Sequence, residues 1–223
     1  MRSILIGLIA LGCTTADEPP IALSVPPAPA IAQGDTIEHV IRFDDANQQY
    51  IEVSTTINNP GSTLMMAVWT PGSYLIREYA RHIEALRITD ENGDPVTVTK
   101  STKNRWEIIG EPKTIRVTYR LYCRELSVRT NWVDSELAIL NGASTFLVPV
   151  DQHDRAHAVQ LILPDTWTGA ASGLPTDSEG RFIARNYDTL VDSPIVAGTP
   201  DVRPFEVHSV PHEMVYLGGD DLW

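Results

Sequence analysis

The residues with the clearest capacity for metal chemistry lie in a short polar segment, residues 153–157, which reads HDRAH. His153 and His157 are spaced as in the H-E-x-x-H motif, in which two histidines on one face of a helix bind zinc. In an extended segment the same two side chains would lie about 13 Å apart, too far to share an ion. Pro149 precedes the segment, and the alternating apolar run AVQLIL follows it. We therefore interpret HDRAH as a surface connection between two strands; an independent metal enzyme built on these histidines is the alternative.

Three further groups have structural interpretations that compete with chemical ones. His212 and Glu213 begin a second H-E-x-x pattern, but Tyr216 occupies the place of the second histidine. Residues 90–94, DENGD, are spaced like the start of a calcium-binding loop, yet the glycine is misplaced and no distal glutamate closes the site. Their Asn-Gly pair instead predicts a hairpin turn.

Cys123 lies on the apolar face of the alternating run TIRVTYRLYC, which predicts a buried core thiol rather than a catalytic nucleophile.

The composition indicates a globular protein and argues against one class of partner. The chain has 223 residues, of which 43% are hydrophobic, and this is enough for one sizeable core. Its formal net charge is −12, and its basic residues are scattered. A nucleic-acid partner is not expected, because neutralising phosphates requires clustered positive charge.

The N-terminus is predicted to direct export. Arg2 is followed by an apolar run, residues 4–11, that is too short to span a bilayer but typical of a signal peptide. The run leads into ALGC, which resembles a bacterial lipobox, so we interpret residues 1–13 as a signal peptide and Cys13 as the site of lipid attachment. A plain secretory signal cleaved after Ala32 is the alternative. The expected location is the bacterial cell envelope, as a lipoprotein that faces the periplasm and reaches the membrane through its lipid anchor, or otherwise periplasmic or secreted.

The rest of the chain predicts a tether followed by a β domain. Residues 14–35 are rich in proline and would form an extended tether of up to roughly 60 Å. From residue 36 onward apolar residues alternate with period two, as in TIEHVIRF, YIEVSTTI, LMMAVW, WEII, TFLVPV, FIARNY and MVYL. A turn or two of helix is expected only within residues 74–86. The predicted fold is all-β, mainly antiparallel, in a sandwich or saddle form with at most one or two short helices.

The most unusual stretch is WTPGSYLIREYARHI, residues 69–83, in which a tight turn leads into mixed aromatic and charged residues. It closely resembles a signature of the N-terminal domain of the glycyl aminopeptidase family, which are exported zinc metallopeptidases of bacteria (peptidase family M sixty-one). The segments NRWEI, VTYRLYCRELSVRTNWVD, LNGASTFLV, LPDTW and YDTLVDSPIVAG fit the same pattern in order, so the resemblance covers about residues 36–217. The residues that carry the signature are Trp69, Pro71, Gly72, Ser73, Tyr74, Tyr187, Asp192, Ser193 and Pro194.

The resemblance implies a β domain of the aminopeptidase N type at residues 36–205, followed at residues 206–223 by a last strand and the truncated start of a catalytic domain. It also implies that zinc and the H-E-x-x-H motif belong to that missing domain. No catalytic or metal residue is therefore carried over to this chain, no cofactor is expected in it, and it is expected to be inactive alone. Family members remove N-terminal residues, with a preference for Gly or Ala, so a peptide substrate is the partner expected through the catalytic domain.

One loop of the β domain is expected to contribute to substrate binding. By analogy with the β domains of related aminopeptidases, Asn141 and Gly142 would face the substrate cleft, and an ordinary Asn-Gly turn is the alternative. The alternative for the whole chain is a free-standing, lipid-anchored β domain that binds peptides or a partner protein.

Overall fold

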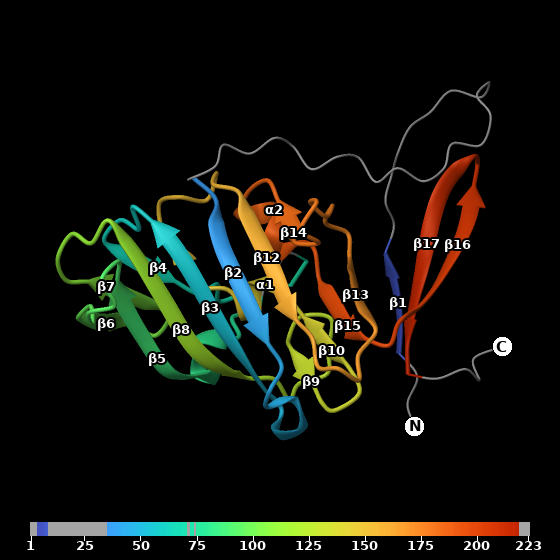
Figure 1. The fold of residues 1–223 in the computed structure, drawn as a ribbon, viewed down its shortest axis with the longest axis horizontal. Coiled ribbons are helices and arrows are strands. Elements are labelled where there is room, and N and C mark those ends of the chain that lie inside the picture. The colour runs from blue at the N-terminus through green and yellow to red at the C-terminus, as the bar shows by residue number, and fades with distance from the viewer. Residues whose placement is uncertain (1–3, 9–34, 71, 74, 219–223) are drawn as a thin grey trace.

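The computed structural model describes residues 35–70, 72, 73 and 75–218, together with the backbone of residues 4–8. Its largest sheet has the strand order β14-β12-β2-β3-β8-β5 (Figure 1). Neighbouring strands are antiparallel except β12 and β2, which run parallel. The bounds are Ile37–Arg42 (β2), Tyr50–Asn58 (β3), Ile83–Asp90 (β5), Thr114–Tyr122 (β8), His157–Ile162 (β12) and Phe182–Ala184 (β14).

One face of this sheet forms the main hydrophobic core. As the period-two pattern predicts, Ile37, Ile41 and Phe43 are all buried on that face, while their polar neighbours are turned towards solvent. Cys123, which follows β8, is also fully buried, and burial raises the pKa of its thiol. The thiol is therefore held in its unreactive protonated form, and the prediction of an inert core cysteine is confirmed.

Two smaller sheets pack against the same core. The first has the order β11-β4-β7-β6, and the second has the order β13-β15-β10-β9. The first contains Thr63–Met65 (β4), Val98–Thr102 (β6), Arg105–Ile108 (β7) and Val148–Pro149 (β11). The second contains Trp132–Val133 (β9), Ala138–Leu140 (β10), Gly169–Ser172 (β13) and Ile195–Gly198 (β15). Leu64 and Trp106 from the first sheet and Leu140 and Ile195 from the second belong to one buried cluster with the large sheet, so the domain has a common interior.

The predicted hairpin at residues 91–94 forms, but its two arms separate. Gly93 has φ 88°, and the amide of Gly93 donates to the Asp90 carbonyl at 3.1 Å. Beyond the turn, β5 pairs with β8 in the large sheet, whereas β6 pairs with β7 in a small one. Turn chemistry therefore predicted the bend correctly, while the choice of sheet depended on partners distant in sequence.

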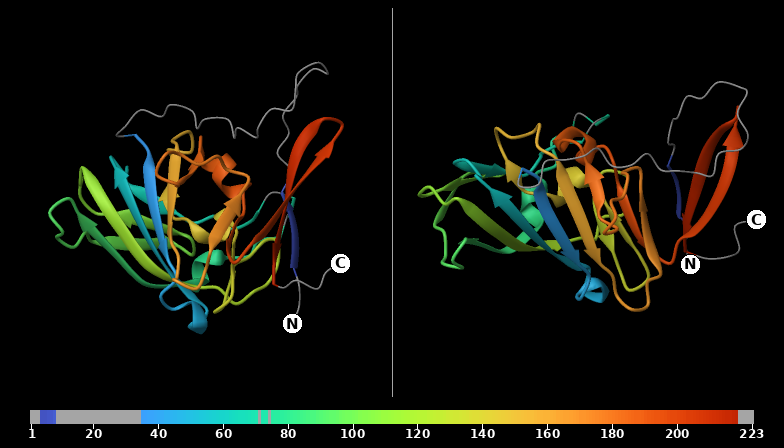
Figure 2. Two further views of the ribbon diagram at one scale, coloured as in Figure 1. Left: turned by 45° about the vertical axis from the view of Figure 1, so that its right-hand side comes forward. Right: turned by 45° about the horizontal axis from the view of Figure 1, so that its top comes forward.

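A third small sheet, with the order β1-β17-β16, stands apart from the main body in both views of Figure 2. Its strands are Ile4–Leu8 (β1), Asp201–Val207 (β16) and Val210–Leu217 (β17). The hairpin turn uses His208 and Ser209, both with positive φ. Val215 and Leu217 anchor the base of the hairpin in a second buried cluster that includes Ile139.

The segments predicted to direct export lie almost wholly outside the described residues. Within the predicted signal peptide the structure describes only the backbone of β1, and Cys13 and nearly all of the tether, residues 14–34, are outside it. The signal peptide, the lipid anchor and the tether therefore stay predictions. Among the residues that are described, no helix is long and apolar enough to cross a bilayer.

The all-β prediction is confirmed, with two short α-helices and two 3-10 turns among the strands of the described residues. These are Ala46–Gln48 (η1), Tyr79–His82 (η2), Gly142–Thr145 (α1) and Tyr187–Val191 (α2). The turn of helix expected within residues 74–86 is η2. The helices α1 and α2 were not expected: α1 ends at Thr145, the first residue of the predicted strand TFLVPV, and α2 begins at Tyr187, the last residue of the predicted strand FIARNY. The reason is local: the side chains of Asn141 and Asn186 each accept a hydrogen bond from a backbone amide in the first turn and so cap the helix. The predicted strand LMMAVW also shortens, since β4 ends at Met65.

Candidate functional site

The signature stretch, residues 69–83, crosses from the end of β4 to the start of β5. Its predicted turn forms: the amide of Ser73 donates to the Thr70 carbonyl at 3.1 Å, and Gly72 adopts φ 74°, a left-handed conformation that suits glycine. The amide of Arg77 then donates to the Val68 carbonyl at 2.7 Å and folds the segment back before η2 begins. Within this stretch Trp69 is half exposed, and Pro71 and Tyr74 lie outside the described residues.

The second half of the signature, residues 187–194, builds and ends α2. Tyr187 is buried at the first position of α2, and the amide of Asp192 caps its end by donating to the Asp188 carbonyl at 3.0 Å. Ser193 and Pro194 then lead into β15, and the Pro194 carbonyl accepts a hydrogen bond from the Ser172 hydroxyl at 3.0 Å. The two halves of the signature thus support different helical turns, η2 and α2.

The helix α1 lies between these turns and contacts both of them. A Cβ atom on Gly142 would come within 2.5 Å of the Leu190 carbonyl oxygen, so α1 can lie against α2 only because this position is glycine. Both polar atoms of the Asn141 side chain are engaged within the chain: its Oδ1 accepts from the Ala143 amide at 3.1 Å, and its Nδ2 donates to the Val128 carbonyl at 3.2 Å. Asn141 and Gly142 are both buried in this chain, and their expected role at a substrate cleft stays a prediction.

Asn131 organises the polar side of α1, and sequence reasoning missed it. Its Oδ1 accepts from the Asn141 amide at 2.8 Å and from the Ser144 hydroxyl at 2.8 Å, and its Nδ2 donates to the Ser144 carbonyl at 3.2 Å. The Tyr119 hydroxyl, donating to the Thr145 carbonyl at 2.6 Å, ties the same helix to the large sheet. Asn131 itself gave little signal, because it lies in the mixed segment RELSVRTNWV, residues 124–133, which a surface loop would show equally well.

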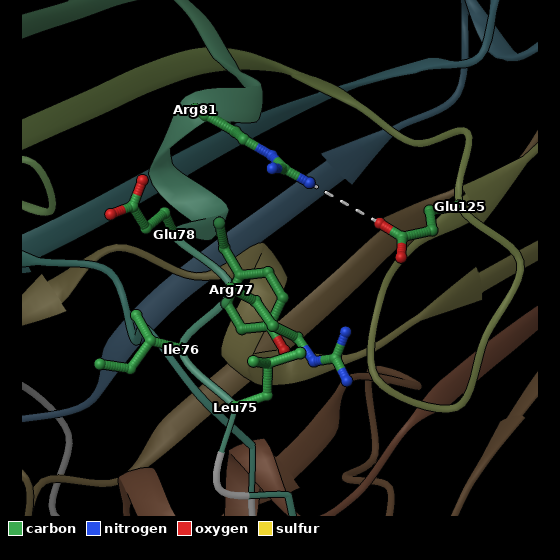
Figure 3. A pocket seen from close by; sticks show the side chains of 7 residues that line it. Leu75, Ile76, Arg77, Glu78, Arg81 and Glu125 are labelled. Atoms are coloured by element: carbon green, nitrogen blue, oxygen red, sulfur yellow. Dashed lines mark ion pairs between the residues drawn. The ribbon is translucent and has the colours of Figure 1, made fainter.

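Two hollows open beside α1 and share Tyr79 and Glu125 as lining residues. One, of about 210 Å³, is lined by Leu75, Ile76, Arg77, Glu78, Tyr79, Arg81 and Glu125 (Figure 3). The other, of about 190 Å³, is lined by Tyr79, His82, Tyr122, Arg124, Glu125, Thr130, Asn131 and Ser144. We call them together the groove. It lies between the signature segment and residues 124–131, and Ser144 of α1 lines its second hollow.

Two ion pairs involve charged residues that line the groove. Arg81 reaches towards Glu125 across the first hollow at 4.0 Å, and both side chains are at least half exposed (Figure 3). Glu78 accepts from Lys103 at 2.5 Å, also at the surface. Exposed pairs of this kind contribute little to stability.

The predicted metal candidates His153 and His157 do not share a helix. Residues 151–156 form turns and a bend, and His157 begins β12. The Nδ1 atom of His157 hydrogen-bonds the Nε2 atom of His39 at 3.0 Å, and His39 in turn bonds the Thr55 hydroxyl at 2.9 Å. His153 instead packs its ring against Tyr187, with ring centroids 4.9 Å apart. Within the residues that the structure describes, no three His, Cys, Asp or Glu side chains are grouped as metal ligands would be.

The buried histidine pair, which was not foreseen, is uncharged at neutral pH. Burial, together with the nearby Arg155 and His153, lowers the pKa of His157 to about 3. Burial and the neighbouring His157 lower the pKa of His39 as well. His39 alternates with Ile37 and Ile41 on the inner face of β2, so its position was predictable from the strand pattern while its partner was not.

The chain belongs to the family of the Peptidase M61 N-terminal domain. The family model matches residues 39–199, and this span includes both halves of the signature, α1 and the groove. A search of curated proteins gave no match.

The fold is similar to that of a solved aminopeptidase N family protein. A crystal structure of an aminopeptidase N family protein from Idiomarina loihiensis is 31% identical, with a TM-score of 0.75 over 80% of this chain. The chain spans 32% of that protein's length. An M1 zinc metallopeptidase from Deinococcus radiodurans is 15% identical, with a TM-score of 0.46 over 77% of this chain and 43% of its own. Native yeast LTA4 hydrolase is 10% identical, with a TM-score of 0.39 over 76% of this chain and 29% of its own. The last two likenesses are too weak to carry an argument.

Proposed function

We propose that this chain is the non-catalytic N-terminal β domain of an exported, glycyl-aminopeptidase-like zinc metallopeptidase. In this role it supports a peptidase domain and forms one wall of the cleft in which that domain holds a peptide. The family match over residues 39–199 is the observation that carries the proposal. The likeness to the Idiomarina loihiensis protein, of which this chain spans about a third, agrees with a domain that works as part of something larger.

The construction of α1 suits it to be a rigid wall. Every residue of Gly142–Thr145 is buried, and the turn is held by the Asn131 side chain on one side and by α2 on the other. A turn fixed in this way gives the second hollow, which Ser144 lines, a rigid back, and preorganised surfaces of this kind are what substrate positioning requires.

The zinc of such a peptidase is assigned to its peptidase domain and not to this one. Hydrolysis of a peptide by zinc requires about three protein ligands, an open position and a general base. The donors available here do not fit: the facing nitrogens of His39 and His157 bond each other, and His153 is directed at Tyr187. The contribution of this domain is therefore to bind and orient.

The proposed location is the bacterial cell envelope, with Cys13 lipidated and residues 14–35 as the tether. The support for this part is the lipobox-like ALGC and the proline content of the tether. Labelling cells with a radioactive fatty acid would test it, because Cys13→Ala should abolish labelling and release the protein from the membrane fraction.

A fusion experiment tests the function. The full chain is joined to the peptidase part of the Idiomarina loihiensis protein, in place of the third that it matches. We expect chelator-sensitive release of p-nitroaniline from glycyl- and alanyl-p-nitroanilide by the fusion and none by the chain alone. A fusion no more active than the isolated peptidase part would contradict the proposal, and peptide binding by the chain alone would favour a free-standing binding domain.

A further inference from the structure

The hairpin of β16 and β17 has two outer edges, and the edge of β16 is protected against the addition of another strand. Every residue of β16 is exposed, and within the described part of the chain its outer side carries no further strand. Pro204 lies in the middle of β16. A proline within a sheet is found where its missing N–H faces away from the ladder, so Pro204 interrupts the row of donors on this edge.

The turn of the hairpin determines which amides of β17 face outward. His208 and Ser209 both have positive φ and form a two-residue loop between the paired residues Val207 and Val210. A turn of this kind directs the amide of Val210 towards the carbonyl of Val207 on β16. Amides of alternate residues in a strand point to opposite sides, so every second residue after Val210 also faces β16, and the residues between them face the outer edge.

The outer edge of β17 is therefore open along one defined stretch. Pro211 belongs to the outward set and contributes no donor, which agrees with the rule for prolines in strands. Beyond it, the outward amides are those of Glu213, Val215 and Leu217. An unprotected row of this length is the feature that accepts an added strand.

The strand β1 occupies this stretch and no more of β17. It runs antiparallel to β17, with Ile4 opposite Leu217, Ile6 opposite Val215 and Leu8 opposite Glu213 (Figure 1). The three residues of β1 that lie opposite the outward amides are thus the ones whose own amides face β17. The span of β1 matches the open row of β17 from end to end, and this match carries the inference.

We propose that the outer edge of β17 is a strand-addition site whose occupant is the apolar segment Ile4–Leu8 of this same chain. The segment lies within residues 1–13, which are predicted to be a signal peptide. Cleavage there would remove β1 and leave the outward amides of β17 without a ladder, so processing of the N-terminus is the event that opens the site. The site is independent of the proposed peptidase function, because it involves only the three strands of this sheet.

Hydrogen exchange followed by mass spectrometry tests the pairing in the full chain, made by cell-free synthesis so that its N-terminus is retained. Ile6→Pro removes an amide that faces β17, and we expect residues 213–217 to exchange about tenfold faster. Gly7→Pro is the matched control, because the amide of Gly7 faces away from β17, and it should change this rate by less than about twofold. Residues 114–122 of β8 should exchange equally in both variants, which shows that the domain stays folded.

A disulfide tests the register by a second route. Gly7 lies opposite Met214, and opposed residues of antiparallel strands have Cα atoms about 4.5–5.5 Å apart, within the range that a disulfide spans. With Cys13→Ser to remove a competing thiol, Gly7→Cys and Met214→Cys should form a disulfide within one chain under mild oxidation. Gly7→Cys with His212→Cys, displaced by two residues, should stay reduced.

Three outcomes would overturn the proposal. The first is unchanged exchange of residues 213–217 in Ile6→Pro, or equal acceleration in Gly7→Pro. The second is a Gly7→Cys and Met214→Cys protein that stays reduced or crosslinks no faster than the displaced pair. The third is a disulfide that joins two chains, because a second copy would then supply the strand.

Discussion

The helix α1 and the signature segment line the same groove, yet they are built in opposite ways. Around α1 the donors and acceptors of Asn131, Asn141 and Ser144 satisfy one another, and the whole turn is buried. In the signature segment, by contrast, the side chains of Leu75 and Ile76 are exposed. One side of the groove is thus completed by hydrogen bonds within this chain, while the other leaves apolar side chains in contact with water.

The largest loss of stability should come from removing the hydrogen bonds of Asn131, which hold α1 on the completed side of the groove. Asn131→Ala leaves the Asn141 amide and the Ser144 carbonyl unpaired in the interior, and we expect the free energy of unfolding to fall by about 3 kcal/mol. Urea unfolding followed by circular dichroism measures this. The exposed Asn47 provides the control, and Asn47→Ala should change stability by less than about 0.5 kcal/mol. Equal losses for the two variants would show that α1 is not held by this network.

A slightly smaller effect is expected at the contact between α1 and α2. Gly142→Ala puts a methyl group 2.5 Å from the Leu190 carbonyl oxygen, so the two helices must separate, at a cost of about 2 kcal/mol. Gly169→Ala is the matched control, because its methyl group would meet nothing closer than 3.7 Å. Thermal unfolding of both variants tests the contrast. A fully stable Gly142→Ala protein would mean that the close approach of the helices is dispensable.

The histidine pair beneath these helices should make stability depend on pH. The pKa of His157 is about 3 in the folded protein against 6.5 for an ordinary histidine, so on acidification the unfolded chain takes up a proton first. Stability is therefore complete above about pH 7.5, and His157 alone should remove about 1.5 kcal/mol by pH 5.5. Urea midpoints measured across this range should show the slope, and His157→Gln should reduce it. An unchanged slope in that variant would assign the acid sensitivity to other groups.

The smallest change in stability is expected for a substitution in the signature segment, the incomplete side of the groove. Ile76→Asp in the isolated chain changes only a side chain in contact with water, so its free energy of unfolding should move by less than about 0.5 kcal/mol. The same urea experiment measures it. A loss comparable with that of Asn131→Ala would mean that Ile76 is already covered within this chain.

Sequence reasoning succeeded where the deciding interactions are local or periodic. The alternation of Ile37, Ile41 and Phe43 predicted which face of β2 is buried, and the Asn-Gly pair at residues 92–93 predicted a turn. Similar apolar runs did not predict which sheet a strand joins, because a strand's hydrogen bonds can be made with many partners of similar pattern. The helices α1 and α2 were missed because their stabilisation comes from a single capping asparagine and from burial, neither of which produces a helical period.

The sequence by itself determined that this is an all-β domain of the M61 N-terminal family with a buried, inert Cys123. These properties follow from residue type and spacing, which are local features of the chain. Only the tertiary structure decided that His157 pairs with His39, that Asn131 supports α1, and that residues 75–79, Arg81 and Glu125 line one hollow. Each of these joins positions distant in the chain, because folding brings together side chains that no short motif contains.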